Sequence, residues 1–181
     1  MHMAEEIPYV LTGRLTDEGI VIDDQKSQEE LKTGGYGEVL DDKLLLKDYE
    51  AMFLLYSGKL KVLEDEKEVS IDKMVSFAIS RDANAWTRFL IYRDLRSRGY
   101  VVREGFGFGV DFRVYDRGDY GSKSAKYVIC GLNEGTEMPI KDLSEVASQA
   151  GRMGKEVVLA VIERRGEIIY YKIQSWRPYN V

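Results

Sequence analysis

From residue 82 onward the sequence alternates between helical and strand periodicity, and this order of elements leaves few possible folds. Asp82 is suited to cap a helix that runs through Arg98 and ends at Gly99. The elements expected after this helix are strands at 100–103, 110–115 and 126–132, a helix over 139–152 and a closing hairpin over 156–176. The pattern predicts a mixed sheet flanked by helices.

The first part of the chain has a different pattern, in which short strands are interrupted by glycines and acidic turns. Short strands are expected within residues 7–25, and a Gly-rich turn and another strand are expected within 32–46. Asp48 is expected to cap a short helix that ends at Gly58, and Ser70 is expected to open a second helix.

The length and composition agree with a folded chain of one or two domains. The 181 residues are 44% apolar and 11% aromatic, which excludes a wholly disordered chain. A change of pattern near residues 80–84 predicts the domain boundary. We therefore expect a small N-terminal α+β domain over 1–81 and a second domain over 82–181, which makes the fold class α+β, or mixed α/β.

Several classes of protein are disfavoured. No apolar run approaches the ~20 residues that a membrane helix needs, so no bilayer-spanning segment is expected. The first ten residues lack the basic and apolar regions of a signal peptide, which favours a cytoplasmic location. The lone Cys130 excludes an internal disulfide framework. Because the net charge is −5, nucleic-acid binding would require a local basic face.

Histidine is almost absent, and this restricts the available chemistry. The only histidine is His2, in the Met-His-Met start of the chain. Imidazole is the usual proton shuttle near neutral pH and the commonest metal ligand. Chemistry at any other place in the chain must therefore use carboxylates, Lys, Tyr or residues of a partner.

Two motifs in the second half have competing interpretations. The Gly105-x-Gly107-x-Gly109 stretch joins two strands, whereas a dinucleotide fingerprint leads from a strand into a helix, so a structural bend is favoured over a phosphate loop. Asp111 could be a nuclease metal ligand. No Glu-x-Lys partner follows on the next strand, so a carboxylate paired with a neighbouring arginine is favoured and no metal or other cofactor is expected.

A tyrosine and several basic residues surround the end of the strand at 110–115. Tyr115 ends this strand, and Lys155 opens the strand after the last helix. A tyrosine hydroxyl can transfer protons, and an ammonium group can stabilise a developing phosphorane. The basic residues of the adjoining loop are Arg117, Lys123 and Lys126. From spacing alone, the interpretation of each of these residues as an ordinary surface residue is favoured over a catalytic role.

The stretch from Phe89 to Pro178 resembles the catalytic domain of archaeal tRNA-splicing endonucleases (tRNA-intron endonucleases). The segments that carry the resemblance are IYRDLRSRGYVV, EGFGFGVDFRVYDRG, KYVI, GKEVVLAVIE and GEIIYYKIQSW. The first half is similar to the N-terminal domain of the same family, in GYGEVL and LLLKDYEAMFLLYSGKLKV. The resemblance implies a restriction-endonuclease-like C-terminal domain.

The resemblance also implies metal-independent cleavage of precursor tRNA at bulge-helix-bulge motifs, which leaves a 2′,3′-cyclic phosphate and a 5′-hydroxyl. The family uses a tyrosine as general base, a histidine as general acid and a lysine on the transition state. By position, the tyrosine is Tyr115 and the lysine is Lys155. The histidine stands three residues before the tyrosine of the next strand, here Tyr127, and that position holds Ser124.

A second family residue is also replaced. An arginine seven residues before the lysine clamps a bulge base in the family, and the corresponding residue here is Ser148. Losing a general acid lowers the reaction rate roughly 10²–10⁴-fold, and losing a stacking partner costs ~1–3 kcal/mol of RNA-binding free energy. The candidate RNA-binding positions are Arg117, Lys123, Lys126, Ser148 and Arg152.

The resemblance further implies assembly into a homo- or hetero-tetramer. In mixed assemblies one kind of subunit is catalytic and the other structural, and an acidic loop of one unit docks into a basic cleft of another. That loop corresponds to residues 133–138, so Glu134 and Glu137 are the expected docking charges. Without the resemblance, a solvated turn would be favoured.

Three hypotheses follow. In the leading one, the chain is the structural, non-catalytic RNA-binding subunit of a heteromeric endonuclease, with a paralogous catalytic subunit and precursor tRNA as partners. In the second, it is an active endonuclease with an altered site, in which water, Lys123 or Lys126 takes the acid role. In the third, it is an RNA-binding or assembly protein outside splicing.

Overall fold

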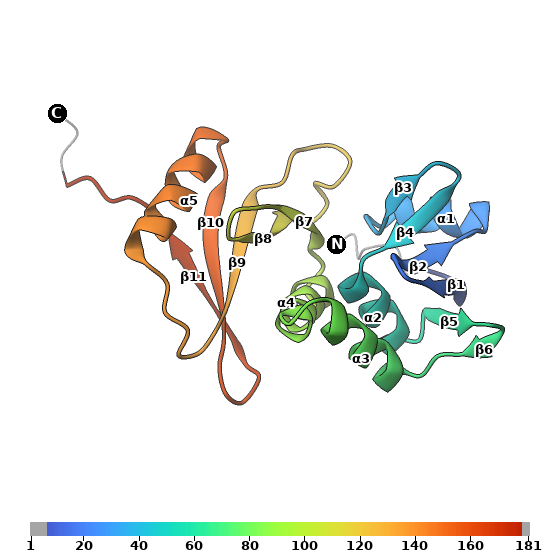
Figure 1. The fold of residues 1–181 in the computed structure, drawn as a ribbon. Coiled ribbons are helices and arrows are strands. Elements are labelled where there is room, and N and C mark those ends of the chain that lie inside the picture. The colour runs from blue at the N-terminus through green and yellow to red at the C-terminus, as the bar shows by residue number, and fades with distance from the viewer. Residues whose placement is uncertain (1–6, 179–181) are drawn as a thin grey trace. The chain divides into compact units, whose positions relative to one another are not determined.

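The computed structural model describes residues 7–178, so His2 lies outside the described part of the chain. The chain separates into two compact units (Figure 1), the first ending at Arg93 and the second beginning at Asp94. Helix α4 (Ala85–Ser97) runs through this division without interruption. The boundary expected between residues 81 and 82 stays a prediction.

The first unit is built on a six-stranded mixed sheet. Its strands are β1 (Leu11–Thr16), β2 (Gly19–Ile22), β3 (Glu38–Leu40), β4 (Lys43–Leu46), β5 (Leu60–Glu64) and β6 (Lys67–Glu68), in the order β3-β4-β2-β1-β5-β6. Strand β1 pairs antiparallel with β2 and parallel with β5. Ile20, Ile22 and Leu44 are completely buried, as apolar strand residues facing a core should be.

Two helices of this unit begin where the sequence predicts them, although one cap was predicted wrongly. Ser70 caps α3 (Ile71–Arg81) by accepting the backbone N–H of Lys73 at 3.2 Å. Asp48 is the first residue of α2 (Asp48–Tyr56) and not its cap. The preceding residue, Lys47, occupies the cap position, and its backbone N–H donates to the carboxylate of Glu50 at 2.8 Å.

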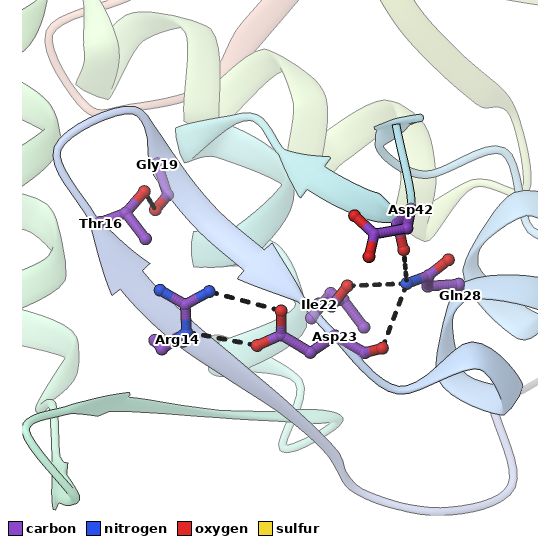
Figure 2. A network of polar contacts seen from close by, with 7 residues as sticks. All are labelled: Arg14, Thr16, Gly19, Ile22, Asp23, Gln28 and Asp42. Atoms are coloured by element: carbon purple, nitrogen blue, oxygen red, sulfur yellow. Dashed lines mark hydrogen bonds and ion pairs between the residues drawn. The ribbon is translucent and has the colours of Figure 1, made fainter. Parts of the chain in front are cut away.

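Helix α1 (Gln25–Thr33) was not expected from the sequence. Leu31 is the only large apolar residue that the helix buries, and Ser27 and Gln28 are buried beside it. The Nε2 atom of Gln28 donates to the carbonyl oxygens of Ile22 at 3.0 Å and Asp42 at 3.0 Å (Figure 2). These hydrogen bonds from a buried amide to carbonyls at strand ends anchor α1 to the sheet. An apolar helix face would otherwise have this role.

The N-terminal part of α4 packs within the first unit. Tyr92 is fully buried, with its ring 4.9 Å from that of Tyr49 and 5.8 Å from that of Phe53 between centroids. Asp82, expected to cap this helix, lies three residues before its first residue and accepts the backbone N–H of Asn84 at 2.9 Å. Its carboxylate therefore stabilises the turn between α3 and α4.

The second unit contains a five-stranded mixed sheet. Its strands are β7 (Val101–Gly107), β8 (Val110–Tyr115), β9 (Tyr127–Asn133), β10 (Glu156–Ile162) and β11 (Ile168–Ile173), in the order β11-β10-β9-β8-β7. Only β9 and β10 pair in parallel, and helix α5 (Ile140–Arg152) connects them. A parallel pair requires such a crossover, and α5 packs Val146 and Ala150 against the buried Val128 and Val157.

Strand β7 is longer than predicted and continues into the Gly-rich stretch. The bend expected there is a two-residue hairpin turn at Phe108 and Gly109, preceded by an irregularity between Glu104 and Gly107. A Cβ atom on Gly105 would lie 2.2 Å from the carbonyl oxygen of Val110, so only glycine fits. The structural bend favoured from the sequence is present as this turn.

The predicted fold class is confirmed: both units combine helices with a mixed sheet, and the described residues form five helices. Among residues 7–178, no helix combines the length and the apolar character needed to cross a bilayer.

Candidate nucleic-acid interface

Three strand ends of the second unit bring the sequence-predicted catalytic positions to one edge of the sheet. Strand β8 ends at Tyr115, while β9 and β10 begin at the same edge. The backbone N–H of Lys126 donates to the carbonyl of Val114 at 2.9 Å, and the N–H of Glu156 donates to the carbonyl of Lys126 at 2.9 Å. These bonds link the residues beside Tyr115 to those beside Lys155.

Tyr115 is half-buried at this edge. It pairs with Val101 in the β7–β8 register, and its ring meets that of Tyr120 edge-on, with 5.0 Å between centroids and an interplanar angle of 89°. Within residues 7–178 its hydroxyl makes no hydrogen bond. The hydroxyl is therefore available to an external acceptor.

Lys155 is held by the turn after α5. Its backbone N–H donates to the carbonyl of Ala150 at 2.8 Å, and Gly154 before it has a φ of 67°. The Lys155 ammonium donates to the main-chain carbonyl of Ala125. Because Ala125 directly follows Ser124, this bond brings Lys155 next to Ser124, the two residues expected from the sequence at the family's lysine and histidine positions.

Ser124 is exposed in the loop between β8 and β9. A serine hydroxyl does not titrate near neutral pH, so it cannot replace an imidazole as general acid. Two lysines stand near it in the sequence, and both are paired. Lys126 Nζ lies 3.1 Å from Asp116 Oδ2, and Lys123 Nζ lies 2.9 Å from Asp119 Oδ1.

These pairs affect both the proton chemistry and the charge of the loop. Contact with Tyr127 and then with Asp116 raises the pKa of Lys126, so this ammonium releases its proton even less readily than a free lysine. Hydrogen bonds from the Arg117 backbone N–H and from Lys126 lower the pKa of Asp116. The ion pairs with Asp116 and Asp119 offset both lysine charges in the loop.

Arg117 and Arg152 differ from the two lysines. The Arg117 guanidinium lies 5.1 Å from the centroid of the Tyr100 ring, an arrangement typical of a cation–π contact. Arg152 makes no hydrogen bond or ion pair with any residue in the range 7–178. It lines a hollow of about 210 Å³ on α5 together with Ser148, one helical turn earlier. Arg152 therefore supplies a cation beside Ser148, the residue expected from the sequence at the family's arginine position.

The predicted docking loop has one bound and one unbound carboxylate. Glu134 accepts the backbone N–H of Arg164 at 3.0 Å, and its own backbone N–H donates to the carbonyl of Ile162 at 2.8 Å. Glu137 is exposed and has no hydrogen bond or ion pair in the described range. Glu134 thus fastens the loop to the β10–β11 turn, while Glu137 is available to another molecule.

Asp111, the alternative metal ligand, has a structural contact. Its Oδ2 atom accepts the backbone N–H of Gly131 at 2.7 Å, which joins β8 to β9. Across residues 7–178, no three His, Cys, Asp or Glu side chains gather as a metal site would require.

Burial, followed by the charge of Asp111, raises the pKa of the Cys130 thiol to about 11, so this thiol stays protonated near neutral pH.

Sequence reasoning missed a groove on the α5 side of the sheet. It has a volume of about 370 Å³ and is lined mainly by apolar side chains of the β7–β8 turn, strands β8 and β9, and helix α5. Phe106 and Phe108 form one wall, and Ala150 and Met153 contribute to the other. Two phenylalanines in a glycine-rich turn were the available signal, because such a turn leaves little room to bury them.

Comparison with known proteins agrees with this architecture. Residues 85–170 match the family model of the tRNA intron endonuclease catalytic C-terminal domain, and residues 11–75 match that of the tRNA intron endonuclease N-terminal domain. A tRNA-splicing endonuclease of Methanothermobacter thermautotrophicus is 33% identical over 92% of this chain and 98% of its own length. One from Pyrococcus furiosus is 34% identical over 80% of this chain and 83% of its own length.

The two domain models match in the order in which the two units occur, and the similarity to the Methanothermobacter protein extends over nearly the whole of both chains. The chain belongs to the tRNA intron endonuclease family.

Proposed function

We propose that this chain is the structural, non-catalytic subunit of a heteromeric tRNA-intron endonuclease that cuts precursor tRNA at bulge-helix-bulge motifs. The observation that carries the proposal is Ser124, which occupies the general-acid position beside the Lys155–Ala125 contact. Tyr115 and Lys155 keep the base and transition-state positions, but without an acid the leaving oxygen has no proton donor.

The paired lysines support this proposal over an active enzyme with an altered site. Lys126 would have to give up a proton that its neighbours hold more tightly than usual. Lys123 would have to leave Asp119 before acting. Lys126 therefore cannot supply a proton at a useful rate near neutral pH, because an efficient general acid has a pKa near the working pH.

In the proposed assembly, the catalytic partner supplies the complete site, and this chain contributes RNA-binding surface and the docking loop. Glu137 is the carboxylate that reaches a basic cleft of the partner, and Glu134 holds the loop in position. Arg117 and Arg152 contact precursor tRNA, with smaller contributions from Lys123 and Lys126, whose charges are offset.

Reconstitution tests the proposal. A bulge-helix-bulge RNA is incubated in EDTA with this chain alone, with a histidine-bearing paralogue from the same organism alone, and with both. We expect cleavage only in the mixture, with 2′,3′-cyclic phosphate ends. Efficient cleavage by this chain alone would contradict the proposal, and so would a paralogue whose activity does not change when this chain is added.

A further inference from the structure

The turn between β7 and β8 presents a phenylalanine in an unusual backbone conformation. Phe108 has a φ of 54° and Gly109 a φ of 88°, the pattern of a type I′ turn, where Asn-Gly is the usual pair. A bulky residue at positive φ is an outlier. Its ring is 91% exposed, so packing does not compensate for the strain. Such strain is typical of functional positions.

The exposed ring belongs to the groove described above. Phe106, also partly exposed, lies on the same wall, and Val110, Val128 and Val146 complete the apolar lining. A volume of about 370 Å³ falls within the range of roughly 300–1,000 Å³ that is usual for small-ligand sites. The groove is therefore large enough for a flat ring inserted between the turn and α5.

Positive charge flanks the groove on both sides. The Arg113 guanidinium lies 5.4 Å from the centroid of the Phe106 ring and forms no ion pair in the described range. Arg152, on the opposite wall, also lacks an ion pair among those residues. The Arg113 Nε atom donates to the carbonyl of Glu104 at 2.8 Å, and its other guanidinium donors, like those of the exposed Arg152, suit phosphates on either side of a bound base.

The groove also offers polar recognition. The side-chain amide of Gln149 lines it and has no hydrogen-bond partner among residues 7–178. An amide provides both donors and an acceptor, which suits the edge of a nucleobase. Single-stranded RNA is recognised by this combination of aromatic stacking, arginine and edge hydrogen bonds.

We propose that this groove binds one unpaired nucleobase of an RNA, stacked on Phe108 and Phe106, with Arg113 and Arg152 on the flanking phosphates. The proposal rests on the RNA-related function proposed above and extends it to a residue set outside the Tyr115–Lys155 edge. It gives this chain a base-binding device although Ser148 replaces the family's arginine.

Binding of the full chain to two labelled RNA hairpins tests this proposal. The hairpins share their stem and loop sequences, but one carries three extra nucleotides as a bulge and the other is fully paired, and fluorescence anisotropy gives both affinities. We expect tighter binding of the bulged hairpin. Phe108→Asn should weaken that binding about 5- to 150-fold, the range for losing one base–aromatic stack, and should leave the paired hairpin unaffected.

Further variants separate stacking from folding and from charge. Asn suits positive φ, so Phe108→Asn should unfold no more easily than the unsubstituted chain, and Phe108→Trp should retain the preference for the bulge. Arg152→Gln should weaken the binding of both hairpins. It should also reduce the slope of the logarithm of the affinity against the logarithm of the salt concentration by about one. Tyr56→Ala is the matched control, because Tyr56 is an exposed ring beneath an arginine, Arg93, but outside the groove.

Two outcomes would overturn the proposal. In the first, Phe108→Asn leaves the affinity for both hairpins unchanged. In the second, the variant binds RNA normally but no longer associates with the histidine-bearing paralogue, which would make the groove a protein-docking site. If the mixed cleavage assay succeeds while Phe108→Asn has no effect on RNA binding, only the groove assignment fails. If the chain binds the bulged hairpin selectively but the mixture with the paralogue does not cleave RNA, the proposed subunit role fails and the proposal for the groove stands.

Discussion

The ammonium of Lys155 donates a hydrogen bond to the carbonyl of Ala125. Parallel pairing of β9 with β10 brings these residues together although they lie thirty positions apart in the sequence. The contact fixes the lysine beside Ser124 and at the same edge as Tyr115. The three residues that the sequence predicts at the catalytic positions therefore lie at one sheet edge, and only Ser124 has a side chain that cannot play its expected part.

Restoring the missing acid should create activity. Ser124→His places an imidazole, with a pKa near neutrality, at the general-acid position, so cleavage of a bulge-helix-bulge RNA should rise by roughly 10²–10⁴-fold over the unsubstituted chain. Single-turnover rates in EDTA, with enzyme in excess, provide the measurement. Ser122→His, in the same exposed loop, is the control and should give no increase. Equal activity of the two variants would contradict the assignment of position 124.

The Gly-rich turn should tolerate side chains unequally. Gly105→Ala forces a Cβ atom to within 2.2 Å of the Val110 carbonyl oxygen, and strand backbones must separate to relieve this contact. We expect a loss of about 1–3 kcal/mol in the free energy of unfolding, measured by urea denaturation. Gly151→Ala is the matched control. It meets open space on α5, so it should stabilise by about 0.5–1 kcal/mol.

The helix that was missed from the sequence should make stability depend on pH. Hydrogen bonds from the Ser27 hydroxyl and then from its backbone N–H lower the pKa of Asp24 below its usual 3.8. A carboxyl whose pKa is lower in the folded state stabilises above its unfolded pKa, and this contribution is lost as pH falls through the folded pKa. The melting temperature should therefore fall below about pH 4, and Asp24→Asn, which keeps a capping side chain, should flatten this fall. Identical pH profiles for the two proteins would contradict this role of Asp24.

The two glutamates of the docking loop should have separable roles. Glu137→Gln removes an exposed, unpaired carboxylate and should weaken association with the catalytic partner, most clearly at low salt. Glu134→Ala should weaken association without the same salt dependence, because it removes the acceptor for the backbone N–H of Arg164 in the same chain. Sedimentation of the mixture at two salt concentrations measures both effects. Glu167→Gln, in the nearby β10–β11 turn, is the control, and an equal effect of all three variants would refute the assignment.

Much of the fold could be predicted because its signals are local. A proline suited to a first helical turn, Pro139, predicted a helix over 139–152, and α5 spans Ile140–Arg152. The alternation in 110–115 predicted β8. Helix α1 escaped prediction because its buried face consists of Leu31 and two polar residues, which periodicity cannot distinguish from a loop.

The candidate site was predictable only in part. The i,i+4 spacing of Asp119 and Lys123 is local, but the Lys126–Asp116 and Glu134–Arg164 contacts join residues ten and thirty positions apart and depend on strand register. The groove depends on the exposed ring of Phe108, which follows from the φ values of one turn. The roles of Tyr115, Lys155 and the RNA-binding positions stay predictions.

Tyr115→Phe in this chain, assembled with an unsubstituted catalytic paralogue, is the most direct test of the non-catalytic role. Phenylalanine keeps the ring contact with Tyr120 but removes the hydroxyl that would act as a base. Cleavage of both strands of a bulge-helix-bulge RNA is measured in EDTA. We expect rates equal to those of the unsubstituted mixture. A loss of roughly 10²-fold or more at either site would show that this chain performs the chemistry itself and would contradict the account.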